Sequence, residues 1–157
     1  MNNNINIIEF EKDILANIDK FLQYKSVEKY FEDKNRIIEI KDLKDASNII
    51  DNLFSNGNNY NCCVYGILIK NKEIGSKWEL KYIGVRQSDK LQQRLKQHFV
   101  KKSKQTNSQL DKIKELQDKA IFGLKLANIA DTKLRNYYEE KLIKDFAPDW
   151  NSHGKKR

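Results

Sequence analysis

Two tyrosines, an arginine, a histidine and a glutamate are the side chains of this sequence whose types and order could support chemistry. Tyr65 and Tyr82 stand in apolar segments, Arg94 and His98 are four residues apart, and Glu139 follows later. A guanidinium can hold an anion through two parallel hydrogen bonds, and imidazole or phenol groups can move protons. A carboxylate is a ligand for a hard divalent cation. We therefore ask which elements place these groups together.

A hairpin is expected to position the tyrosines. Residues 62–69 and 78–85 are compact apolar runs, which predict two strands, and the polar residues 71–76 between them predict a turn. Symmetric pairing across this turn sets Tyr65 directly opposite Tyr82. Directly opposed residues share one face of a sheet, about 5 Å apart at their Cβ atoms. Two phenols are thus expected side by side.

A helix is expected to position the arginine and the histidine. Asp89 and Gln92 form a plausible N-terminal cap, and Leu91, Leu95 and Phe99 recur at helical spacing. On a helical wheel Arg94 and His98 fall beside this apolar stripe. Both side chains should therefore border the core.

The last helix is expected to position the glutamate. Before it, residues 108–119 predict a helix and residues 121–126 a strand. Asp131 is expected to cap the last helix and Pro148 to end it. On its wheel Glu139 lies on the apolar side, whereas Glu140 lies among solvent-facing positions.

The N-terminal third has a different pattern. Apolar residues recur at helical spacing through residues 5–55, and the Gly and Asn residues of the loop at 55–59 interrupt this pattern. We expect a helical N-terminal extension over residues 1–58 that serves in dimerisation or as a DNA clamp. Residues 59–157 would form the main domain, and 157 residues suit one domain with such an appendage.

The net charge of +8 is unevenly distributed. Residues 1–60 hold 8 Lys and Arg against 11 Asp and Glu, whereas residues 61–157 hold 22 against 11. A basic region gains affinity for nucleic acid by releasing counterions from the phosphates. The alternative is a lysine-rich, solvated surface. The lysines and arginine that could follow a DNA backbone are Lys90, Lys96, Lys101, Lys102, Lys104, Lys155, Lys156 and Arg157.

Cysteine content and hydropathy bear on the cellular compartment. Cys62 and Cys63 are the two cysteines, and neighbours on a strand point to opposite faces, so they are expected to be thiols. No N-terminal leader pattern and no apolar window of membrane-spanning length occurs. We expect a protein of the reducing cytoplasm without a membrane partner.

In order and spacing, these motifs resemble the signature of the GIY-YIG nucleases over residues 62–151. The matching elements are Val64-Tyr65, Tyr82-Ile83-Gly84, Arg94-x-x-x-His98, Glu139 and Pro148-x-x-Asn151. The first element departs from the family pattern, because Cys63 replaces its leading glycine and the interval between the tyrosines is longer. The resemblance implies an α+β fold with a small, mainly antiparallel three-stranded sheet flanked by helices.

The resemblance also implies a mechanism, hydrolysis of a DNA phosphodiester by water. Tyr65 would be the general base, and neighbouring cations would have to favour its phenolate, or its proton would pass to His98. Tyr82 would hydrogen-bond the water or the phosphate, and Arg94 would clamp the phosphate. Glu139 would hold one Mg²⁺, with Mn²⁺ as a substitute, and the substrate would complete the site. Asn151 would orient a phosphate or bridge the site.

Each of these residues also has an ordinary structural explanation. Tyr65 and Tyr82 could be hairpin aromatics that pack on the core, and Arg94 could pair with a surface acid. A lone histidine such as His98 at an apolar border is often a packed, hydrogen-bonded residue. Glu139 could pair with a cation at i+4, although Ile143 occupies that place. An asparagine before a tail is often a turn residue.

Within the family, a restriction endonuclease that cuts a specific duplex sequence is the expected type, because few residues follow Asn151. A structure-specific repair nuclease or a homing nuclease is the alternative within the class. A non-catalytic nucleic-acid-binding module is the alternative of another class. One site per chain predicts a homodimer for cutting both strands of double-stranded DNA.

Overall fold

The computed structural model describes residues 18–55, 60, 62–87, 90–102 and 108–151. Helices and one antiparallel sheet make up these parts, so the expected α+β class is confirmed. Several sequence predictions fall outside the described residues. They concern the helical pattern at residues 5–17, the side chain of Cys62, Asp89, Lys104 and the basic residues 155–157. No described helix is long and apolar enough to cross a membrane.

The sheet has four strands, whereas three were expected. Its order is β1 (Ile38–Ile40), β4 (Ala120–Asn128), β2 (Cys62–Asn71) and β3 (Glu79–Gln87), and neighbouring strands are antiparallel. The additional strand comes from the N-terminal part that the sequence predicted as helical. A three-residue strand is too short to give a period-2 pattern that stands out from the flanking helical spacing.

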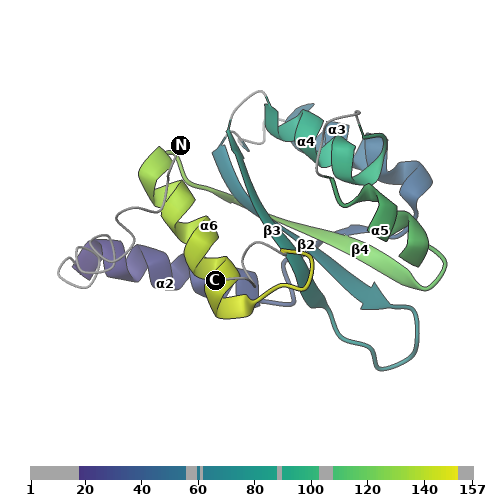
Figure 1. The fold of residues 1–157 in the computed structure, drawn as a ribbon, viewed down its shortest axis with the longest axis horizontal. Coiled ribbons are helices and arrows are strands. Elements are labelled where there is room, and N and C mark those ends of the chain that lie inside the picture. Colours follow the sequence, from purple (N-terminus) through teal and green to yellow (C-terminus); the bar gives the residue numbers. More distant parts are fainter. Residues whose placement is uncertain (1–17, 56–59, 61, 88–89, 103–107, 152–157) are drawn as a thin grey trace.

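Helices cover both faces of this sheet (Figure 1). The first layer holds α3 (Ala46–Ser55), α4 (Lys90–Phe99) and α5 (Leu110–Leu116), with a short 3₁₀ turn at Leu43–Asp45 before α3. The second layer holds α2 (Ile18–Glu32) and α6 (Thr132–Phe146). Strand side chains alternate between two hydrophobic clusters, so each layer has its own core.

The described N-terminal residues share these cores with the rest of the chain. Ile40, Ala46 and Ile50 are fully buried in the cluster that also holds Tyr65 and Leu95. Residues 38–55 are therefore packed into the same unit as β2 and α4. The expected role of residues 1–58 in dimerisation or DNA clamping stays a prediction.

Side chains close the two edges of the sheet where no strand pairs. At one edge the Tyr30 hydroxyl accepts from the Leu126 N–H (3.0 Å) and donates to the Leu126 carbonyl oxygen (3.2 Å). At the other edge the Asn151 carboxamide accepts from the Ile83 N–H (2.8 Å) and donates to the Ile83 carbonyl oxygen (2.9 Å). Unpaired edge groups of a strand would otherwise need water or another chain.

Candidate active site

Tyr65 lies on β2 with its ring fully buried under α4. Its pairing partner on the neighbouring strand β3 is Gly84, and the Tyr65 ring lies over that glycine. A Cβ atom at Gly84 would be 2.5 Å from the Tyr65 hydroxyl oxygen and 2.6 Å from Cζ. The glycine of the Tyr82-Ile83-Gly84 motif therefore provides the space that the Tyr65 ring occupies.

The expected opposition of Tyr65 and Tyr82 is wrong in register. Tyr82 pairs with Ile67, and the register shifts between Ile67 and Leu68, which indicates a bulge. Next to the turn, Ile69 already pairs with Glu79 instead of Trp78, and the extra residue at the bulge displaces the pairings beyond it by one more, so symmetric counting from the turn fails. The two tyrosines still share a face because Tyr82 and Gly84 are two residues apart. Their ring centroids are 6.2 Å apart.

Arg94 and His98 lie on the inner side of α4, as expected from the wheel. Leu91, Leu95 and Phe99 are buried on this helix, and the two polar residues are buried beside them, with exposed fractions of 6% and 0%. Residues 90–99 contain no glycine, proline or β-branched residue, which favours a helix. The same turns that bury the leucines thus carry the cation and the imidazole inward.

Hydrogen bonds determine which nitrogen of His98 carries the proton. The backbone N–H of Gln109 donates to Nδ1 (3.0 Å), so Nδ1 is an acceptor and the proton of the neutral ring lies on Nε2. Nε2 is 2.9 Å from the Tyr65 hydroxyl oxygen and therefore donates to it. Burial, together with the smaller effects of the Arg94 and Arg86 charges, lowers the pKa of His98 to about 3. His98 is thus a neutral donor, which is not poised to accept the Tyr65 proton.

Opposing effects act on the Tyr65 hydroxyl. Burial, with a smaller contribution from Tyr82, raises the pKa of Tyr65 well above its usual value, and the opposing effects of Arg94 and Arg86 offset this only in part. Arg94 also hydrogen-bonds Tyr65, and its Nη1 donates to Gln97 Oε1 (3.1 Å). The neighbouring cations therefore lower the pKa of Tyr65 only in part, and the expected phenolate stays a prediction.

Three rings meet at this point of the sheet. The His98 ring centroid is 5.8 Å from that of Tyr65 and 5.3 Å from that of Tyr82. Tyr82 is half-buried, so its ring lies between the buried cluster and the surface. The structure therefore brings together four of the sequence-predicted residues, which are Tyr65, Tyr82, Arg94 and His98.

Glu139 belongs to the other layer of the fold. It lies on α6, which packs on the face of the sheet opposite α4 and against β3, the edge strand. On the wheel of α6 it falls inside the arc of Arg135, Leu142 and Ile143, which are buried. Glu139 is half-buried, as is its neighbour Glu140.

Asn151 is almost completely buried, with both ends of its carboxamide bonded to the backbone of Ile83. The neighbouring Trp150 N–H donates to the Lys81 carbonyl oxygen (2.9 Å). The segment that follows α6 therefore runs along the outer edge of β3 and bonds to Lys81 and Ile83, on either side of Tyr82. Both hydrogen-bonding ends of the Asn151 carboxamide are engaged by Ile83. Asn151 therefore holds in place the strand that carries Tyr82.

A metal ion would find few protein ligands here. Among the described residues, no group of three or more His, Cys, Asp or Glu could hold a metal ion. Mg²⁺ commonly takes only one or two carboxylates and keeps several waters beside substrate phosphates. The expectation of Mg²⁺ with Glu139 as its ligand stays a prediction.

The expected DNA-contacting lysines that the structure describes lie on or just beyond α4. Lys90, Lys101 and Lys102 are exposed and Lys96 is half-exposed. Lys96 Nζ is 2.6 Å from Asp51 Oδ1, and Lys102 Nζ is 2.6 Å from Asp111 Oδ2.

The sequence reasoning missed three residues of this site. Arg86 follows Tyr82 and Gly84 at a period of two on β3, and its charge reaches both Tyr65 and His98. Strand alternation alone could have identified it. No sequence pattern identifies Gln97 or Gln109. Gln97 acts through its contact with Arg94, and Gln109 acts through its backbone N–H, which bonds His98.

Comparison of this chain with protein-family models, with curated proteins and with solved structures finds no match. The resemblance to GIY-YIG nucleases therefore rests on the motif residues.

Proposed function

We propose that this chain is a Mg²⁺-dependent DNA endonuclease with a site of the GIY-YIG type. The observation that carries the proposal is the Tyr65 hydroxyl, which is buried and receives hydrogen bonds from both Arg94 and His98. A phenol that only packs in a core needs no such pair of donors. A phenol that becomes an anion during a reaction does, because each donor stabilises the negative charge.

In this proposal Tyr65 is the general base that accepts a proton from the attacking water. Arg94 and His98 reduce the cost of the phenolate, and the neutral Nε2–H of His98 keeps donating throughout. Arg94 also offers its remaining guanidinium donors to the phosphate, where they stabilise charge that develops in the transition state. Tyr82, at the surface side of the cluster, would orient the water or the phosphate.

Glu139 would be the one protein carboxylate for a weakly held Mg²⁺. It lies on α6, across the sheet from Arg94 and against the edge strand β3, and DNA phosphate and waters would complete the coordination. When bound, the ion would supply a positive charge to the phosphate and the departing oxygen.

DNA is the proposed substrate because the charge of the chain is concentrated in the part that holds the site. Residues 61–157 have 22 Lys and Arg against 11 Asp and Glu. Phosphate contacts by such residues position a duplex without reading its sequence. The finer proposal is a restriction endonuclease, which would cut one specific duplex sequence.

Digestion of a mapped plasmid with Mg²⁺ tests the proposal. Wild type should give discrete fragments, Tyr65→Phe should cut at least about 100-fold more slowly, and Tyr60→Phe should cut normally. Glu139→Ala should abolish Mg²⁺-dependent cleavage while retaining DNA binding, and the neighbouring Glu140→Ala should retain both. Full activity of Tyr65→Phe or Glu139→Ala would overturn the assigned roles.

The same digestion separates the alternatives. Preference for branched DNA over linear duplex would indicate a structure-specific repair nuclease. DNA binding without cleavage under any divalent cation would indicate a non-catalytic binding module.

A further inference from the structure

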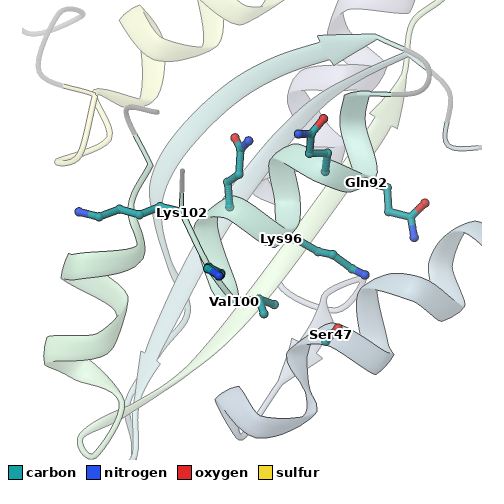
Figure 2. Close-up of a pocket in the computed structure, with 8 residues that line it drawn as sticks. Ser47, Gln92, Lys96, Val100 and Lys102 are labelled. Atoms are coloured by element: carbon teal, nitrogen blue, oxygen red, sulfur yellow. The ribbon is translucent and has the colours of Figure 1, made fainter. Parts of the chain in front are cut away.

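The outward side of α4 faces a hollow, lined mostly by glutamine and lysine side chains, that the proposed mechanism does not use. This hollow has a volume of about 610 Å³, and its lining includes Gln92, Gln93, Lys96, Gln97 and Lys101 (Figure 2). In Figure 2, Lys96 extends toward α3, the helix that carries Ser47. The same helix buries Arg94 and His98, so one element carries the reactive groups inward and this row of amides and cations outward.

The hollow lacks the acidic residues of an ordinary solvated helix face. Residues 90–110 contain six Lys and Arg and no Asp or Glu, although the whole chain has 22 acidic residues. Exposed helices usually mix both signs, because oppositely charged residues at i and i+4 stabilise them. The two acids that do meet the lysines of this face, Asp51 and Asp111, come from other helices. A face of cations and amides complements a polyanion that presents hydrogen-bonding edges.

Most polar groups of this face are already held in place. Gln92 Nε2 donates to Asp51 Oδ1 (2.7 Å), and Gln97 Oε1 accepts from Arg94. Gln93 is exposed at the crest of the helix, opposite the buried stripe. Within the described part of the chain its carboxamide has no hydrogen-bond partner. It therefore retains the donor and the acceptor that together match an adenine edge in the major groove.

We propose that duplex DNA docks on this outer face of α4, with Gln93 reading a base edge and Lys101 contacting a backbone phosphate. This inference rests on the proposed nuclease function and adds the surface that selects the sequence. Gln97 connects the surface to the site, because its Oε1 holds the Arg94 guanidinium. A duplex seated on the outer face of α4 would therefore be connected through Gln97 to Arg94, which the same helix buries on its inner side.

Four single variants test the proposal, two on the surface and two matched controls elsewhere. Lys101→Ala is compared with Lys77→Ala, because both lysines are exposed, and Lys77 lies between β2 and β3. Gln93→Ala is compared with Gln117→Ala, an exposed glutamine just after α5. Each purified variant is checked for wild-type thermal unfolding. Binding to a labelled duplex is measured at several salt concentrations with Ca²⁺, and plasmid cut sites are mapped with Mg²⁺.

Lys101→Ala should weaken binding and lower the slope of log K against log salt by about 1, whereas Lys77→Ala should not. Gln93→Ala should lower the preference for the cognate site over singly substituted sites by about tenfold or more, whereas Gln117→Ala should keep it. If wild type cuts DNA and the surface variants match their controls, this inference fails and the nuclease proposal stands. Cutting by wild type without sequence preference, or an effect of Lys101→Ala alone, also overturns the base-reading surface. If wild type neither binds nor cuts DNA, both proposals fail.

Discussion

Tyr65 combines the burial of a core aromatic with a hydroxyl group that contacts polar side chains. The ring is buried like any core aromatic, yet its hydroxyl faces Arg94 and His98. The opposing Gly84 leaves room for the ring, and His98 is held in one tautomer by a backbone N–H. At the scale of single residues, the site therefore depends on the room that Gly84 leaves for the Tyr65 ring and on which nitrogen of His98 carries the proton.

Gly84→Ala should disturb Tyr65, because the added Cβ would come 2.5 Å from its hydroxyl oxygen. Contacts of this kind force shifts that cost about 1–3 kcal/mol. We expect a lower urea midpoint and a cleavage rate reduced by more than the loss of folded protein explains. Wild-type stability together with wild-type cleavage would show that the ring does not need this space.

His98 should make folding stability depend on pH. Its pKa of about 3 in the folded chain lies below the ordinary value of 6.5, so the unfolded chain binds the extra proton between these values. Stability is then fully present above about 6.5 and declines by up to about 1.4 kcal/mol per unit as pH falls toward 3. Urea unfolding of wild type and His98→Gln from pH 7 to pH 4.5 measures this. Identical pH slopes for the two proteins would contradict it.

Strand β3 shows how an element is completed by residues far away in sequence. It is an edge strand, and it carries Tyr82 and Gly84. Trp150 and Asn151 pair with its outer edge, and α6 packs on the face of the sheet opposite Tyr65. The Tyr82-Ile83-Gly84 motif is therefore held between β2 on one side and the segment after α6 on the other.

Asn151→Ala should loosen this edge. The substitution leaves the buried N–H and carbonyl of Ile83 without their partner, a loss of about 1–3 kcal/mol. Urea unfolding should show the lower stability, and hydrogen exchange should show faster exchange of the Ile83 amide. Asp149→Ala, which removes an exposed partner of Lys81, should cost less than about 1 kcal/mol. Equal effects of the two substitutions would argue against this role of Asn151.

In the described part of the molecule, Tyr65, Tyr82, Arg94 and His98 form one candidate cluster on one face of the sheet, whereas duplex DNA has two strands. All described elements from β1 to α6 share the two cores of that sheet. Cutting both strands thus requires a second chain or a second binding event.

We expect two chains on one duplex. Sedimentation with a cognate duplex and Ca²⁺ should show two protein chains of 18.6 kDa per DNA, and the cleavage rate should rise more steeply than linearly with protein concentration. A single chain per duplex that still makes double-strand breaks would contradict the dimer.

Much of the candidate site was predictable because its signals are local. The hairpin prediction put Tyr65 and Tyr82 on one face, which holds because the register differs by an even number of residues. Helical spacing placed Arg94 and His98 at the border of the core, and Asp131 caps α6 as expected. These predictions succeed because the period of a strand or a helix is set by residues that follow one another in the chain.

Tertiary structure decided the features that depend on distant partners. The pairing of Ile69 with Glu79 and the bulge between Ile67 and Leu68 set the strand register, and the short β1 became a fourth strand only by pairing with β4. The Gln109 N–H selected the tautomer of His98, and Ile83 engaged both ends of Asn151. The packing of α6 placed Glu139 across the sheet from Arg94. None of these follows from periodicity, because a hydrogen bond between segments far apart in sequence leaves no repeating pattern in either segment.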